Sequence, residues 1–275
     1  MRTLMIAAAV LMGCLSTPLF AQQPMQLVGT FSSTKLYAKP GQTLNSSFEL
    51  TLDPNYHPTI FRSSVSDFYP SEDGKQSFYP PSGTIASSCG KWVTLNPVEK
   101  RVNPGEKLDV RLTVSVSADT QPGGYWCALS VDQLADPVEG NADSNEETQV
   151  HLSFLASIST GIFVYVQPLN RSAQIVAVEI SDRQAKVKLT NDGNTPIAVE
   201  GRFEFSGEVL TGEPVKIVLP RTTIFREPAN STIIAVPLPP AEQLPSGAYS
   251  VRLILDIGLD HLIGVQKKIV LQRTK

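Results

Sequence analysis

The chain lacks most of the groups on which enzyme and metal chemistry depends. It has only three histidines, His57, His151 and His261, and none stands at metal-ligand spacing from another histidine, a cysteine or a carboxylate. It also has no Gly-x-Ser-x-Gly turn, no His-Glu-x-x-His pair and no glycine-rich phosphate loop before a helix. Carboxylates that meet only in space stay open, because sequence spacing does not reveal them. We expect a protein that is not an enzyme and that uses no metal or other cofactor.

Charge is scarce and nearly balanced. The chain carries 23 Lys and Arg against 26 Asp and Glu, for a net charge of −3. Without a basic stripe, we expect no nucleic-acid partner. Beyond the amino terminus no run is apolar enough to cross a bilayer, so we expect no transmembrane segment.

The first residues predict export. Arg2 precedes an apolar run, Leu4–Gly13, that is too short to span a bilayer. A cleavage site ending in a small residue, Ala21, follows the run, so we expect residues 1–21 to be a signal peptide cleaved after Ala21. The alternative is a lipid tether, because the Leu-Met-Gly-Cys stretch ending at Cys14 resembles a lipobox. Either outcome predicts a location in the periplasm, outside the cell or in the envelope of a bacterium.

Removing the signal leaves two of the three cysteines, Cys89 and Cys127. An even number in an exported chain predicts a disulfide bond between them, and the alternative is a pair of buried free thiols. Neither cysteine belongs to a Cys-x-x-Cys pair, so redox catalysis is not expected.

Apolar and polar residues alternate through much of the chain, which is typical of half-buried strands. The alternating stretches are Leu44–Leu52, Lys107–Val116, Gln149–Ser159, Gly161–Val166, Gln174–Ile180 and Ala185–Thr190. Proline and glycine turns separate them, and no helical periodicity appears beyond the signal. The pattern predicts an all-β protein of antiparallel sandwiches.

An internal repeat with an offset of 124 residues predicts two copies of one sandwich. Over 28 ungapped positions the matches place equivalent apolar residues, glycines and tyrosines together. Tyr125 matches Tyr249, and each begins a late strand after a small-residue turn. Such a tyrosine either forms a tyrosine corner or is an ordinary half-buried aromatic residue. Pro168 marks a strand end, so we expect one domain over residues 25–167 and another over residues 168–275.

Four aromatic residues flank a predicted hairpin turn: Phe68, Tyr69, Phe78 and Tyr79. They form either an exposed surface for a polymer or peptide, or a hairpin whose alternate aromatic side chains complete the core.

Several stretches resemble the periplasmic chaperones of pilus assembly, the PapD-like group of tandem immunoglobulin-like proteins. They are Trp92–Val114, Gly123–Asp132, Ser159–Pro168 and Lys188–Gly201. The resemblance covers most of the mature chain and implies two immunoglobulin-like antiparallel β-sandwich domains. Chaperones of that group that work with an outer-membrane usher hold a subunit's terminal carboxylate with two basic residues. This chain has Lys35 near the first position and Phe163 at the second, so it resembles a divergent member that lacks that pair.

The resemblance implies a non-enzymatic chaperone that binds an extended segment of a secreted or surface subunit by strand addition. The expected edge is the last strand of the first domain, with Ile162, Phe163, Val164 and Tyr165 as partner-binding residues. The alternative is a structural or adhesive envelope module that binds glycan, peptidoglycan or another surface protein.

Overall fold

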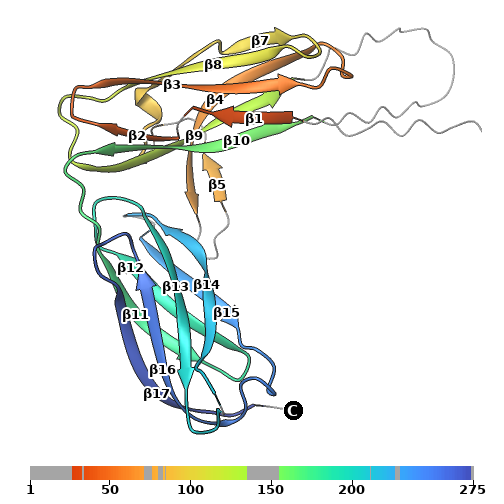
Figure 1. Ribbon diagram of the computed structural model, residues 1–275. Coiled ribbons are helices and arrows are strands. Elements are labelled where there is room, and N and C mark those ends of the chain that lie inside the picture. The colour runs from red at the N-terminus through yellow and green to blue at the C-terminus, as the bar shows by residue number, and fades with distance from the viewer. Residues whose placement is uncertain are drawn as a thin grey trace, which may run out of the picture.

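Two β-sandwiches follow one another along the chain and meet at an angle, which gives the molecule the outline of an L (Figure 1). This computed structural model describes residues 27–32, 34–70, 76–79, 83, 85–134, 155–210, 212–226 and 230–273. The predicted signal peptide and Cys14 lie outside the described residues.

The first sandwich has two sheets. One has the order β1-β3-β8-β6, formed by β1 (Leu27–Phe31), β3 (Thr43–Leu52), β8 (Lys107–Ser115) and β6 (Val93–Asn96). The other has the order β2-β10-β9-β4-β5, formed by β2 (Lys35–Ala38), β10 (Ser157–Val166), β9 (Gly123–Gln133), β4 (Thr59–Pro70) and β5 (Gln76–Tyr79), with β7 (Glu99–Val102) paired to β4. This second sheet lies on the side of the second sandwich (Figure 1).

The second sandwich is built in the same way from the remaining strands. One sheet has the order β11-β12-β15, formed by β11 (Ala173–Ile180), β12 (Gln184–Asn191) and β15 (Ser231–Pro237). The other has the order β14-β13-β16-β17, formed by β14 (Val215–Ile224), β13 (Ile197–Ser206), β16 (Gly247–Asp256) and β17 (Ile263–Leu271). The chain is thus all-β, with two tandem immunoglobulin-like sandwiches.

The alternation in the sequence explains which side of each strand is buried. In β8 the apolar residues Leu108, Val110, Leu112 and Val114 are all buried, and the residues between them are exposed or half-buried. Successive side chains of a strand point to opposite faces, so one row enters the core and the other meets water. The same rule holds in β12, whose alternate residues are buried in the second core.

The repeat appears in the strand boundaries. β8 begins at Lys107 and β15 at Ser231, and β9 begins at Gly123 and β16 at Gly247, so both pairs keep the offset of 124. β9 and β16 each have a strand on either side in their sheet, whereas β8 is internal in its sheet and β15 is at the edge of its described sheet. The repeat in sequence is therefore a repeat of strand boundaries, and of sheet position for β9 and β16.

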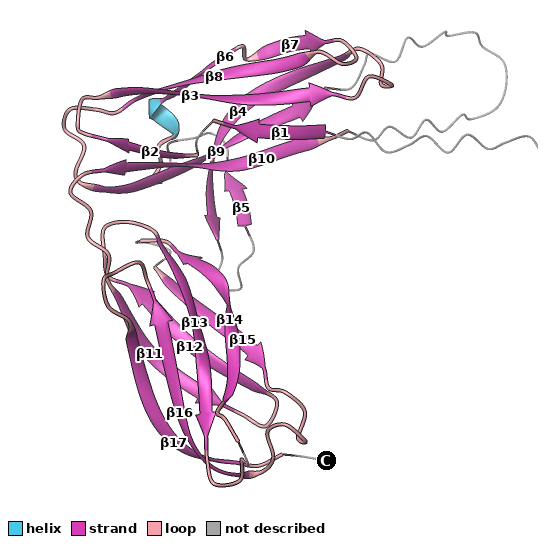
Figure 2. Cartoon of the chain, in the orientation of Figure 1, coloured by secondary structure: helices cyan, strands magenta, loops and turns pink. Residues whose placement is uncertain are grey.

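Strands account for nearly all regular structure in the described part of the chain, where the one helical element is the single turn η1 (Gly90–Trp92) (Figure 2). Within those residues, no helix has the length and apolar character needed to cross a membrane.

Candidate partner-binding site

The two tyrosines of the repeat make equivalent hydrogen bonds. The Tyr125 hydroxyl donates to the Gln121 carbonyl oxygen at 2.8 Å, and the Tyr249 hydroxyl donates to the Pro245 carbonyl oxygen at 2.7 Å. Each ring is buried and each bond spans four residues. Of the two interpretations left open by the sequence, the tyrosine corner is the one the structure shows.

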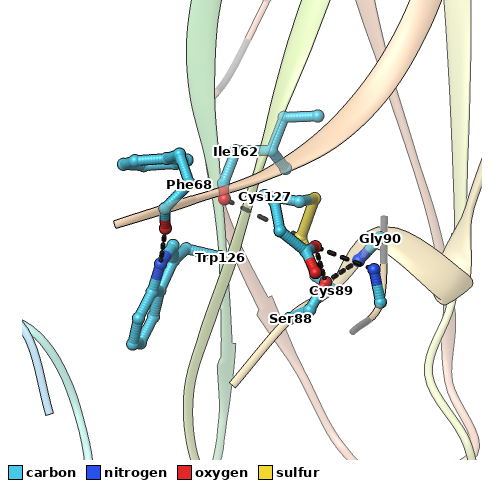
Figure 3. The surroundings of a disulfide bond; sticks show 9 residues. Phe68, Ser88, Cys89, Gly90, Trp126, Cys127 and Ile162 are labelled. Carbon is cyan, nitrogen blue, oxygen red and sulfur yellow. Dashed lines mark hydrogen bonds between the residues drawn. A yellow bond between two sulfur atoms is a disulfide. The ribbon is translucent and has the colours of Figure 1, made fainter. Parts of the chain in front are cut away.

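Cys89 and Cys127 form a disulfide bond, with 5.3 Å between their Cα atoms (Figure 3). The bond joins β9 to the segment before η1. Backbone hydrogen bonds reinforce this link, because the Cys89 N–H donates to the Trp126 carbonyl and the Trp126 N–H donates to the Ser87 carbonyl. The segment 85–89 is therefore held along β9 by covalent and hydrogen bonds together.

A buried carboxylate holds the same segment from the other side. Asp67 of β4 is fully buried and accepts hydrogen bonds from the Gly83 N–H at 2.8 Å, the Ile85 N–H at 3.2 Å and the Ser88 hydroxyl. Because a buried carboxylate is costly unless it is hydrogen-bonded, these donors explain why an acid is tolerated there. Asp67 thus fixes the path of the chain beside the disulfide.

The joint between the sandwiches is built on the outer face of β9. The Trp126 ring is fully buried, and its Nε1 donates to the Phe68 carbonyl oxygen at 2.9 Å (Figure 3). Phe225, which follows β14, packs on Trp126 with 4.7 Å between ring centroids. Phe68, Ala128 and Phe163 complete this small apolar cluster. The second sandwich is therefore seated against the first through aromatic contacts.

Polar contacts complete the joint. The Gly124 N–H donates to the Asn194 carbonyl oxygen at 2.7 Å, and the Asn194 side-chain amide donates to the Pro122 carbonyl at 3.3 Å. Glycine is needed at 124, because a Cβ there would lie 2.3 Å from Cδ of Pro196. The glycine pair at the start of β9, Gly123 and Gly124, allows the second sandwich to approach closely.

The last strand of the first sandwich is paired unevenly along its two sides. β10 pairs with β9 along its whole length, Ser157–Val166, but β2 covers its other side only along Phe163–Val166. Within the described part of the chain, no strand pairs with Ser157–Ile162 on the side away from β9. We call this stretch of β10 the open edge.

The backbone groups of the open edge can be assigned to a side. The Ala156 carbonyl accepts from the Gln133 N–H on β9, whereas the Phe163 N–H donates to the Thr34 carbonyl beside β2. Because backbone groups alternate sides along an antiparallel strand, the N–H and C=O groups of Ser157, Ser159 and Gly161 point away from β9.

These pairings correct the expected position of the partner-binding edge. Phe163, Val164 and Tyr165 lie where β2 already takes the place beside β10, and Ile162 is the last residue of the open edge. Ile162 and Val164 are buried in the first core, and Phe163 and Tyr165 are half-buried on the outer face. The sequence analysis missed this pairing, because β2 has only four residues and nothing in them indicates a parallel partner more than 100 residues later in the chain.

The predicted aromatic surface is also corrected in part. Phe68 is buried, with 3% of its surface exposed, because Phe225 of the second sandwich packs on it at 5.8 Å between ring centroids. Phe78 is 46% exposed and lies beside Phe68 across the β4–β5 hairpin. The side chains of Tyr69 and Tyr79 lie outside the described residues.

Lys35 and Phe163 are direct partners in the register of β2 and β10. The two positions where the resemblance implies a basic pair are thus adjacent, and an aromatic ring occupies one of them. Tyr37 and Tyr165 are the next pair on that face, stacked at 5.1 Å. Burial raises the pKa of the Tyr165 phenol, Tyr37 adds to the rise and Arg171 opposes it. Tyr165 is therefore neutral at neutral pH.

Two functional residues of the joint escaped the sequence analysis, Phe225 and Arg226. They follow the last residue of β14, outside any alternating stretch, so no pattern marks them as contacts of a distant strand. Among the described residues, no group of three or more histidine, cysteine or acidic side chains is placed to hold a metal ion.

The fold and the site together define a protein of two tandem immunoglobulin-like sandwiches, in which part of β10 has no strand partner on one side among the described residues. No family model matches the sequence, and no curated protein matches it. Among solved structures, the chain is similar in fold to several bacterial chaperones. Chaperone DraB of E. coli matches with a TM-score of 0.42 and 16% identity, covering 90% of this chain and 99% of that one. Chaperone CupB2 of Pseudomonas aeruginosa matches with a TM-score of 0.44 and 11% identity, covering 88% and 100%. Chaperone SafB of Salmonella enterica, in complex with the pilin SafA, matches with a TM-score of 0.42 and 12% identity, covering 89% and 98%.

Proposed function

We propose that the protein is a non-enzymatic, extracytoplasmic chaperone-like protein that binds an extended segment of a secreted or surface subunit of the pilus type. The bound segment, here called the guest, adds as a strand to the open edge, Ser157–Ile162. The observation that carries this proposal is the unpaired side of that stretch. Unpaired N–H and C=O groups in a row are a ready template for another strand.

The other sheet of the first sandwich has an edge strand, β1, beside the open edge. Among the described strands β1 pairs with β3 alone, so it is also an edge. It lies close to the open edge, because Cδ1 of Ile158 is 3.7 Å from the position of a Cβ built on Gly29. Phe31 and Ile158 are half-buried against the first core. Alternate apolar side chains of a guest would pack against these two residues, which gives selectivity for an alternating sequence.

The disulfide bond and the predicted signal peptide support an extracytoplasmic location. Disulfides persist mainly in oxidising compartments. A chaperone for exported subunits would work there, before the subunits pair with one another.

The test removes one outward N–H without disturbing the β9 ladder. Proline at an edge position with an outward N–H is tolerated in a sheet, so Ser159→Pro should fold. The matched control, Ser159→Ala, keeps the N–H and loses only the hydroxyl, which bonds the Ser130 hydroxyl at 2.7 Å. Wild type and both variants are used for affinity capture from the organism's own cell envelope, and the bound polypeptides are identified by mass spectrometry.

We expect wild type and Ser159→Ala to retain one β-rich secreted polypeptide near one to one, and Ser159→Pro to lose it. Hydrogen exchange on the complex should then show new protection at Ser157, Ser159 and Gly161, whose N–H groups face the guest. Equal capture by the proline variant would exclude the open edge as the site.

The alternative is a structural or adhesive envelope module that binds glycan, peptidoglycan or another surface protein. The exposed rings of Tyr37, at 56%, and Phe78, at 46%, favour it. A cell-wall pull-down with Tyr37→Ser and Phe78→Ser separates the two functions. Wall retention that falls in these variants but not in Ser159→Pro would support the alternative.

A further inference from the structure

Five aromatic rings form a continuous row on the outer face of the β2-β10-β9-β4-β5 sheet. The neighbours along it are Tyr37 and Tyr165 at 5.1 Å, Tyr165 and Phe163 at 6.5 Å, Phe163 and Phe68 at 6.5 Å, and Phe68 and Phe78 at 6.1 Å between ring centroids. We call these residues the aromatic row. Its two end rings, Tyr37 and Phe78, are among the most exposed large apolar side chains of the first sandwich, whereas Phe68 within the row is buried under Phe225.

The aromatic row begins where the open edge ends. Gly161 is the last residue of the open edge whose backbone points away from β9. A Cβ at Gly161 would lie 3.0 Å from Cε2 of Phe163 and 3.4 Å from Cζ of Phe68. Because Gly161 has no side chain, the distal atoms of these two rings lie directly beside its backbone. Phe68 is buried under Phe225, so the half-buried ring of Phe163 is the one that a strand added beside Gly161 would contact.

β2 forces a guest to leave the sheet at this point. The place beside Phe163 is occupied by Lys35, its register partner, so a guest strand cannot continue in the sheet past Gly161. On the outer face the next surface along β10 is the ring of Phe163, followed by Tyr165 and Tyr37.

We propose that the aromatic row receives an apolar side chain, best an aromatic one, from the guest residue at or just beyond Gly161. This inference rests on the proposed function and names the kind of segment it selects. A large side chain opposite an edge glycine covers the bare backbone, and aromatic pairs add to the burial of apolar surface. The guest is thus an alternating segment that ends in, or begins with, an aromatic or long aliphatic residue.

The orientation of the rings argues for a side chain over a sugar. Tyr37 and Tyr165 are nearly parallel, at 26° with 5.1 Å between centroids, so each covers part of one face of the other. Beside Gly161, the nearest ring atoms are Cε2 and Cζ of Phe163, at the distal end of its ring. At that point the row therefore offers a ring edge. Ring edges suit the face of another aromatic ring, in the edge-to-face arrangement, whereas a sugar stacks on a free ring face.

The test uses peptides of defined sequence as probes. The parent peptide has about eight alternating valine and serine residues, the length of an ordinary strand. One version carries phenylalanine at the end and its partner carries serine, and both are made in the two chain directions with a fluorophore at the opposite end. Binding is measured by fluorescence anisotropy with wild type, Phe163→Ala, Tyr37→Ser, Ser159→Pro and the control Val218→Ser, an exposed apolar residue of β14.

We expect wild type and Val218→Ser to bind the phenylalanine peptide about tenfold more tightly than the serine peptide in one chain direction. Phe163→Ala and Tyr37→Ser should lose most of this preference and keep the affinity for the serine peptide. Tyr37→Ser guards against a folding defect, because more than half of the Tyr37 side chain is already in water.

Equal affinity of wild type for the two peptides overturns the inference. If Ser159→Pro then still abolishes binding of both peptides, the open edge is the binding site and the aromatic row does not contribute to selectivity. If wild type binds no peptide in either direction, the proposed function and the inference both fail. Retention of peptidoglycan that Tyr37→Ser removes, without any peptide preference, would assign the aromatic row to a glycan and overturn the inference as well.

Discussion

The Nε atom of Arg226, in the second sandwich, donates a hydrogen bond of 3.1 Å to the Ser87 hydroxyl of the first. The same guanidinium lies 4.8 Å from the centre of the Tyr125 ring. Ser87 belongs to the segment that the disulfide and Asp67 hold along β9. One arginine thus connects the second sandwich to the covalently fixed part of the first.

Arg226→Ala should loosen the joint while both sandwiches stay folded. The loss combines a hydrogen bond and a cation–π contact, together about 1–2 kcal/mol. Small-angle scattering should show a wider range of overall dimensions than in wild type. The matched control is Arg221→Ala, whose exposed ion pair with Glu200 contributes little. An unchanged scattering profile for Arg226→Ala would show that Phe225 and the Asn194 contacts hold the joint alone.

Replacing both cysteines by serine should lower the unfolding free energy of the first sandwich by roughly 3–4 kcal/mol, from the chain-entropy estimate for a loop of this size. The closed loop spans 38 residues. Thermal unfolding of wild type with and without a thiol reductant, beside the double variant, measures the effect. The reductant should lower the wild-type midpoint and leave the variant unchanged; a wild-type midpoint that does not move would contradict the prediction.

Tyr125→Phe and Tyr249→Phe should each cost about 1 kcal/mol, because each removes a tyrosine-corner hydrogen bond and leaves a carbonyl without it. Urea titration measures both variants. The structure predicts similar costs, since the two bonds have lengths of 2.8 and 2.7 Å and both rings are buried. A cost confined to one variant would mean that the two corners are not energetically equivalent.

Glu204→Gln should make stability less dependent on acid pH. Hydrogen bonds from Arg252 and then Arg202 hold the pKa of the Glu204 carboxyl below its ordinary value of 4.5. Because the folded pKa is depressed, this stabilisation is present above the ordinary pKa and is lost as pH falls through the folded value. The difference in unfolding midpoint between wild type and variant should therefore narrow as the pH is lowered below 4.5. A difference that stays constant down to strong acid would contradict it.

Much of the scaffold could be predicted because it rests on local patterns. The alternation in Lys107–Ser115 and the matched tyrosines 125 and 249 report which faces are buried, and each pattern fits inside one strand. The disulfide followed from the count of cysteines and the predicted compartment.

The site was harder because it depends on contacts between distant segments. The sequence predicts only that Phe68 belongs to an aromatic hairpin. Its burial depends on Phe225 of the other sandwich, which packs on it. The position of the open edge is decided by β2, whose four residues pair parallel to β10. Neither contact produces a periodic pattern of residues, so neither could be predicted from the sequence.

The two copies of the sandwich differ on the outward face of the strand that begins with the matched tyrosines. The offset that matches Tyr125 with Tyr249 matches the next residue, Trp126, with Ser250. Trp126 is buried at the joint, whereas Ser250 accepts a hydrogen bond from the exposed side chain of Gln266. A chimera made of two second copies would keep both hydrophobic cores and have no joint. One outward position, tryptophan in the first copy and serine in the second, thus decides which of two similar sandwiches can receive a neighbouring domain.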